Sequence, residues 1–158
     1  MGDQIYRAYL SLLHSIRSNL EQMCELARQK IEAVRNDDLL ALDEILKQEQ
    51  ALALDFRGLE QKRLSMLNEM GLGELRLSEL SGYYPADMRT EVRKAVEDLQ
   101  NQYQIYQNDA KVARNTLECS LHEIERTLAS LGRTSEAGPG YGRGEVEPPR
   151  AMKTDFRA

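Results

Sequence analysis

The chain has 158 residues, a formal net charge of −5 and 41% hydrophobic residues, with no Trp and two Phe. This length corresponds to one domain. A composition with 30% charged and only 6% aromatic residues is typical of long helices with a narrow apolar seam. The acidic balance and the lack of a basic stripe indicate that nucleic acid is not the partner, because phosphate neutralisation supplies most of the affinity of nucleic-acid binders.

The chain shows no targeting or membrane signal. Its N-terminal segment MGDQIYRAYLSLLHS lacks the basic region and apolar core of a signal peptide. No apolar run approaches the roughly 18 residues that a membrane span needs. Cys24 and Cys119 are far apart and outside any C-x-x-C pair, which fits a reducing compartment. We therefore expect a soluble cytoplasmic protein without a membrane span.

Residues 3–35 contain neither Pro nor Gly and predict the first long helix. Apolar residues recur there at alternating spacings of three and four, with Lys30 as the one polar member of the series. This heptad pattern is typical of a helix that packs lengthwise against another helix. The apolar members are Tyr6, Tyr9, Leu13, Ile16, Leu20, Met23, Ala27 and Val34.

The segment Asn36-Asp37-Asp38 predicts a turn followed by a new helix over about 38–70, since Asp and Asn favour the helix N-terminus. Two seam positions of this helix are occupied by Glu49 and Arg63. Either they lie at the edge of a wide seam, or they are buried and set register or contact a partner. The apolar seam residues are Leu42, Ile45, Leu52, Phe56, Leu59, Met66 and Met70.

Gly71 and Gly73 end this helix, and 74–84 predicts one short turn of helix. Pro85 is then expected as the first residue of a third helix over about 86–131. This helix would be roughly 65–70 Å long, so part of it should lack full cover from its own chain. Its stripe comprises Val92, Val96, Leu99, Tyr103, Tyr106, Ala110, Ala113, Leu117, Leu121, Ile124, Leu128 and Leu131.

The remaining residues, 133–158, contain four Gly and three of the four Pro of the chain. Such a composition buries too little apolar surface to offset the entropy of ordering. We expect residues 1–132 to form the helical domain and 133–158 to be a flexible tail.

The sequence carries no pattern for catalysis, for a metal or for a cofactor. The two histidines, His14 and His122, lack the partners that a metal site on a helix requires, although Glu118 lies four residues before His122. No phosphate-binding glycine loop, G-x-S-x-G or H-E-x-x-H occurs. We expect no enzyme activity, no bound metal and no cofactor.

The leucine-rich end of the third helix is the candidate binding surface. Its ordinary interpretation is a bundle core or a homodimer seam. Its functional interpretation is a strip that receives an amphipathic helix of a client protein. The predicted contact residues are Leu117, Leu121, Ile124, Leu128 and Leu131.

A set of short segments recurs in an order and spacing typical of one family. In the second helix these are 38–46 (DLLALDEIL), Glu49-Gln50 and 59–63 (LEQKR), followed by Gly71 with 75–80 (LRLSEL). Ser120-Leu121-x-x-Ile124 and Tyr141-x-x-Gly144 come later. Over about 15–145 the chain thus resembles the FlgN family of flagellar export chaperones. The family's asparagines ahead of the Ser-Leu segment are replaced here by Ala110 and Ala113.

The resemblance implies an elongated all-α protein that binds the C-terminal helices of hook-associated proteins. It further implies that the chaperone keeps these clients from premature assembly and delivers them to the flagellar export gate. A structural coiled-coil protein, acting as a tether or adaptor whose seam closes in a homodimer, is the alternative. The residues alone leave a homodimer open in either case.

Overall fold

The computed structural model describes residues 2–132, which form three long α-helices and one 3-10 helix and, within that range, no strand. The elements are α1 (Gly2–Arg35), α2 (Leu39–Glu69), η1 (Leu77–Tyr83) and α3 (Arg89–Ser130). This arrangement confirms the all-α fold with three long helices. The predicted flexible tail, 133–158, lies outside the described residues, so this prediction and the boundary at 132 are not tested.

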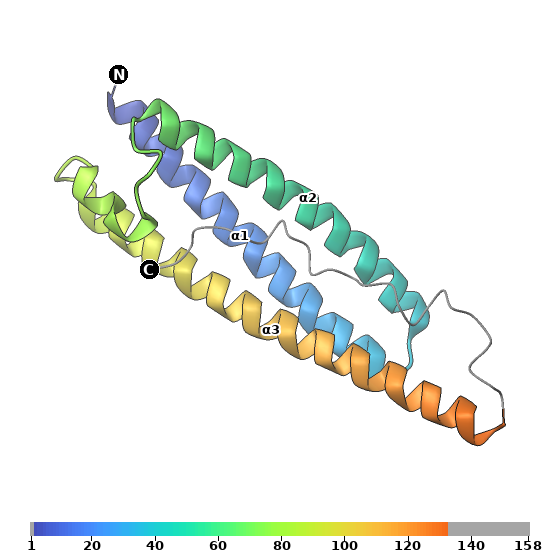
Figure 1. Ribbon diagram of the computed structural model, residues 1–158. Helices are drawn as coiled ribbons and strands as arrows, with labels where there is room; N and C mark the ends of the chain where they lie inside the picture. Colours follow the sequence, from blue (N-terminus) through green and yellow to red (C-terminus); the bar gives the residue numbers. More distant parts are fainter. Residues whose placement is uncertain (1, 133–158) are drawn as a thin grey trace.

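α1 is the central helix of the molecule (Figure 1). α2 runs antiparallel to α1 on one side, and α3 runs parallel to α1 on the other. Both α2 and α3 pack on α1 but contact one another little, while η1 packs on α3. The result is an elongated helical hairpin with a third long helix beside it, and its core lies along α1.

The core follows the apolar seams of the three helices. Tyr9, Ile16 and Leu20 of α1 are fully buried, as are Phe56 of α2 and Val92 and Leu99 of α3. Because α1 meets a helix on each of two sides, residues next to its seam, such as Leu10, Leu12 and Cys24, are buried as well. This double contact widens the buried part of α1, and the exposed residues of its middle, such as Ser18, Gln22 and Glu25, lie on the remaining face.

The turn between α1 and α2 is formed by residues 36–38, as the sequence predicts. Asp38 is the N-cap of α2, and its side chain accepts a hydrogen bond of 3.0 Å from the backbone N–H of Ala41. Asp37 adopts a positive φ of 52°, a conformation that Asp and Asn tolerate better than most residues. This short turn holds α2 antiparallel to α1.

The connection from α2 to α3 differs in part from the sequence prediction. Gly71 has a φ of 73° and ends α2, as expected. Pro85, however, is not the first residue of α3, which begins at Arg89. Residues 85–88 form a turn in which the Met88 N–H donates to the Pro85 carbonyl oxygen at 2.9 Å. Tyr84 is extended, as is usual for the residue before a proline, and the chain makes one turn over 85–88 before α3 begins.

The same connection closes one end of the bundle. Its apolar side chains Leu77, Leu80, Tyr84 and Met88 join the main core. The Tyr84 hydroxyl donates a 2.9 Å hydrogen bond to the Tyr6 carbonyl oxygen, and the two rings meet edge to face at 4.7 Å. We call Leu77, Leu80, Tyr84 and Met88 the end cap. It leaves the opposite end of the bundle, at the α1–α2 turn, without such a cover.

Candidate functional site

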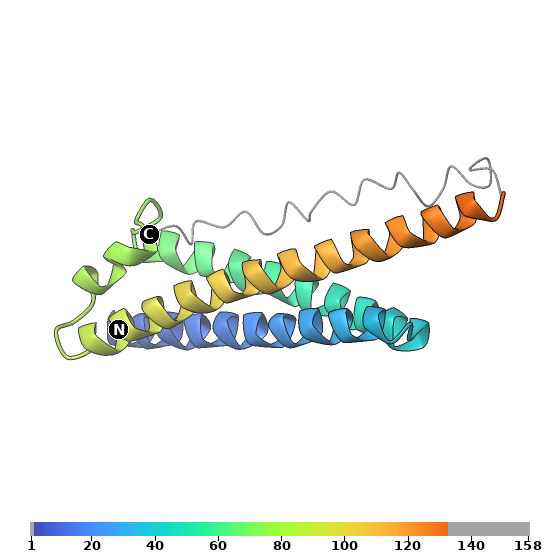
Figure 2. The same ribbon diagram turned by 90° about the horizontal axis from the view of Figure 1, so that it is seen from below.

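α3 extends past the ends of α1 and α2 (Figures 1 and 2). Two ion pairs show its register on α1: Arg17 with Asp98 at 3.5 Å and Arg28 with Asp109 at 3.3 Å. Both pairs join residues 81 positions apart, so the last residue of α1, Arg35, lies level with about residue 116 of α3. Residues 116–131 are therefore the overhang of α3. At 1.5 Å per residue they extend about 22 Å beyond α1.

Burial along α3 falls off where α1 ends. Ala113 is the last buried residue of α3, Leu117 is half-buried, and all residues from 121 to 132 are exposed. Figure 2 shows α3 diverging from α1 toward this end. Apart from half-buried Leu117, the predicted site thus lies in the part of α3 that the described residues of its own chain leave uncovered.

Four large apolar side chains form one face of the overhang. They are 41–68% exposed and follow one another at spacings of three and four residues, which places them on one side of the helix. They continue the helix face on which Tyr106 and Ala113 are buried. Together with half-buried Leu117 they form what we call the apolar strip: Leu117, Leu121, Ile124, Leu128 and Leu131.

The α1–α2 turn brings further exposed leucines to the same end of the molecule. Leu39 and Leu40 are 76% and 87% exposed in the first turn of α2. Neither leucine was predicted from the sequence to be a binding residue. A signal was available, because adjacent helical residues are about 100° apart and two successive leucines cannot both face one seam.

Glu49 and Arg63 occupy different surroundings. The Glu49 carboxylate lies at the seam edge and pairs with the Lys30 ammonium at 2.5 Å, so the polar member of the α1 seam meets one of the two polar members of the α2 seam. Arg63 is buried, with 4% of its surface exposed, and its guanidinium contacts one carboxylate oxygen of Glu60 at 2.5 and 2.7 Å. These placements leave a role in register or partner contact as a prediction.

Tyr9 completes the buried polar cluster around Arg63. Burial raises the pKa of the Tyr9 hydroxyl, and the nearby Arg63 guanidinium partly opposes this shift. For Arg63 itself burial lowers the pKa, but the Glu60 carboxylate together with Tyr9 more than offsets that effect and the pKa is raised. A charged guanidinium is therefore retained within the core between α1 and α2.

The remaining reactive side chains are dispersed. His14 and His122 are exposed, and within residues 2–132 no group of three His, Cys, Asp or Glu side chains is placed to hold a metal ion. Cys24 is buried and accepts a 3.2 Å hydrogen bond from the Gln102 amide, while burial raises the pKa of its thiol. Cys119 is exposed on the overhang.

The architecture is that of an elongated all-α coiled-coil protein with one uncovered apolar helix end. The family model described as FlgN protein matches residues 1–147, and the chain belongs to this family. FlgN proteins are flagellar export chaperones, a chaperone family and not an enzyme family. No curated protein and no solved structure matches the chain. None of the helices among residues 2–132 is long and apolar enough to cross a membrane.

Proposed function

We propose that this chaperone acts in the cytosol and binds the C-terminal helices of hook-associated proteins on its apolar strip. The observation that carries the proposal is the overhang, where four large apolar residues of one helix face are exposed beyond the end of α1. An amphipathic client helix that lies along this face would take the place that α1 occupies further up α3. Helix-in-groove binding of this kind is a recurring mode of peptide recognition.

The apolar surface of the strip is large enough to bind such a client helix. The side chains of the strip are already partly packed. Covering each of them with a client helix therefore contributes on the order of 1–2 kcal/mol to the free energy of binding. Four or five of them, with the matching face of the client, support roughly micromolar binding after the entropy of association is lost. An uncovered strip of this kind also promotes aggregation, which favours a partner that covers it.

The chaperone role follows from the same chemistry. A client helix that later assembles with its neighbours has an apolar face, and the strip covers that face until assembly. We propose that the bound client is thereby kept from premature assembly and is delivered to the flagellar export gate. Membership of the FlgN family supports this role.

The test is calorimetry of the purified protein with peptides from the C-terminal ends of hook-associated proteins, with light scattering on the same samples. We expect saturable 1:1 binding that Leu121→Asp combined with Leu128→Asp abolishes. The matched control is Ile105→Asp combined with Val112→Asp. These residues are similarly exposed on α3, but their positions place them on a different face of the helix.

Three results would contradict the proposal. Unchanged binding by the Leu121/Leu128 variant, with helicity retained, would show that the strip is not the site. Equal loss in both double variants would show a nonspecific effect of the added charge. A stable homodimer that ignores every peptide would favour the structural coiled coil, in which the strip closes against a second copy.

A further inference from the structure

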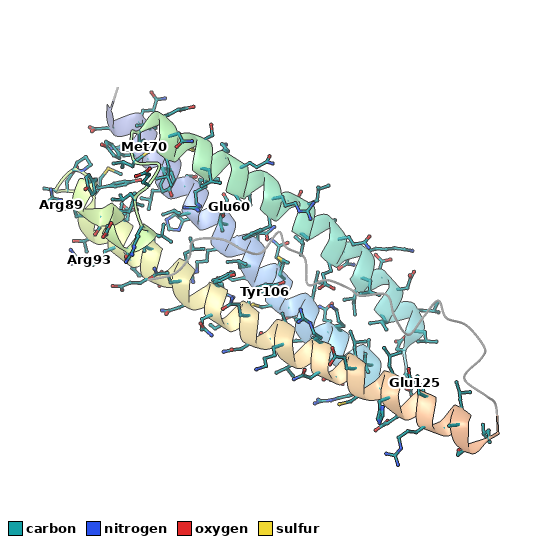
Figure 3. All side chains as sticks on the ribbon, viewed as in Figure 1. Glu60, Met70, Arg89, Arg93, Tyr106 and Glu125 are labelled. Atoms are coloured by element: carbon teal, nitrogen blue, oxygen red, sulfur yellow. The ribbon has the colours of Figure 1, made fainter. Side chains whose placement is uncertain are left out.

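The charges around the apolar strip are predominantly negative. Residues 116–132 carry three carboxylates, Glu118, Glu123 and Glu125, against one cation, Arg126, for a formal charge of −2. All three glutamates are exposed, and none of them is in an ion pair among the contacts of the described residues. Figure 3 shows Glu125 on the part of α3 that projects past the other helices.

The glutamates border the strip on both sides. Successive helical residues are turned by about 100°, which places Glu118 and Glu125 beside Leu121 along one edge. The same geometry places Glu123 beyond Ile124 on the other edge, and Arg126 on the far face. A helix that lies on the strip would therefore have carboxylates along both of its flanks.

The neighbouring α1–α2 turn adds to this field. Residues 35–47 carry four carboxylates and two cations, for a formal charge of −2, and one of those cations, Lys47, is paired with Asp43 at 2.9 Å. These two short segments together hold −4 at one end of the bundle, which is most of the −5 of the whole chain. The acidity is thus concentrated around the uncovered strip.

From this arrangement we infer that the client segment is an amphipathic helix of about four turns whose apolar stripe is bordered by Lys and Arg. The inference rests on the proposed function and specifies the chemistry of the client. Complementary charges along the rim of an apolar contact speed association and exclude partners of the wrong sign. A helix bordered by Glu and Asp would meet like charge on both flanks.

The experiment uses two synthetic peptides of about 16 residues, a length that matches the overhang. Both carry the same leucine stripe and have equal helicity in solution, but one is flanked by Lys and Arg and the other by Glu. Binding to the full chain is measured by fluorescence anisotropy at two salt concentrations. We expect the basic peptide to bind at least about tenfold more tightly at low salt, since three exposed ion pairs together give an effect of this order.

Two triple variants distinguish the effect of the carboxylates beside the strip from the effect of the net charge of the protein. The first variant should remove most of the preference for the basic peptide, and it combines Glu118→Gln, Glu123→Gln and Glu125→Gln. Gln keeps the helix propensity of Glu. The matched control replaces three exposed glutamates elsewhere, Glu69, Glu74 and Glu79, by Gln and should leave the preference unchanged. The preference should also fall with added salt, because the screening length is about 10 Å at 0.1 M.

The outcomes distinguish this inference from the proposed function. Equal binding of the two peptides, lost in both cases with Leu121→Gln and Leu128→Gln, would overturn the charge rule and keep the strip as the client site. A preference that both triple variants weaken equally would also overturn the inference, because it would reflect net charge alone. Failure of the strip variant to affect any peptide, including those from hook-associated proteins, would instead refute the proposed site.

Discussion

Arg63 is a charged residue that is buried in the core. Its guanidinium is held by Glu60, three residues earlier on α2, and lies near Tyr9 of α1. Removing one partner of a buried pair leaves an uncompensated charge, whereas replacing both by apolar residues is often neutral or stabilising. The pair therefore need not add stability, although each member depends on the other.

We predict that Arg63→Met lowers the free energy of unfolding by about 3 kcal/mol, because the Glu60 carboxylate loses its partner. Adding Glu60→Leu to Arg63→Met should restore most of that loss. Urea denaturation of the wild type, the two single variants and the double variant measures the coupling. If the double variant were less stable than both single variants, the pair would not be coupled as described.

Tyr106 makes the stability sensitive to high pH. Burial raises the pKa of its hydroxyl to about 12, above an unfolded value near 10. The neutral form is thus favoured in the folded state, and its contribution is fully present below pH 10 and is lost as pH rises toward 12. A pKa shift of this size contributes at most about 2–3 kcal/mol to the free energy of unfolding below pH 10.

The matched variant is Tyr106→Phe, which keeps the ring and removes the titrating group. We expect the free energy of unfolding of the wild type, relative to this variant, to stay constant up to about pH 10 and then to fall. Urea titrations at a series of pH values measure the difference, in which Lys and the other Tyr residues cancel. A difference that stays flat above pH 10 would show that Tyr106 ionises without penalty.

At the scale of the elements, α3 is one helix in two environments. Its first half, which includes Val92 and Leu99, is buried against α1, whereas its overhang is exposed throughout from residue 121 on. Isolated helices of this length are marginal in water, and most helical stability in proteins comes from packing. The two halves should therefore open with very different free energies.

We predict that amide hydrogens at 92–106 exchange slowly and that those at 121–130 exchange far faster in the free protein. A bound client helix should slow exchange in the overhang while leaving 92–106 unchanged. Hydrogen exchange with mass spectrometry, with and without a client peptide, measures both. Strong protection of the overhang that grows with protein concentration would instead indicate self-association through the strip.

Several features of the fold could be predicted from the sequence, and others could not. The three helices, the Asp38 cap and the uncovered end of α3 follow from local spacing and from the unequal lengths of the helices. The end cap was not predicted, because the bond from Tyr84 to Tyr6 joins residues 78 positions apart. The buried Asn19 amide, which donates to the Leu52 carbonyl oxygen at 3.1 Å, was missed for the same reason. Glu60, three residues from Arg63 on the same helix, did leave a local signal, as did the successive Leu39 and Leu40.

One part of the candidate site could likewise be predicted from the sequence, and another part could not. The strip residues were predicted from their heptad spacing, and the structure places them where α1 has ended. The charged rim depends on which residues flank a face that only the fold leaves open. Stability and binding should therefore reside in different parts of α3, the first in the half packed on α1 and the second in the overhang.

This division makes a prediction for the whole molecule. Leu121→Gln with Leu128→Gln should change the free energy of unfolding by less than about 1 kcal/mol, since surface substitutions that keep helix propensity are nearly neutral. Leu99→Ala, at a fully buried position, should cost roughly 2–5 kcal/mol. A client peptide at about a hundred times its Kd stabilises a folded protein by about 2.7 kcal/mol. Thermal unfolding should show this gain in the wild type and in Leu99→Ala but not in the Leu121/Leu128 variant. A gain that survives in the strip variant would place the client elsewhere on the molecule.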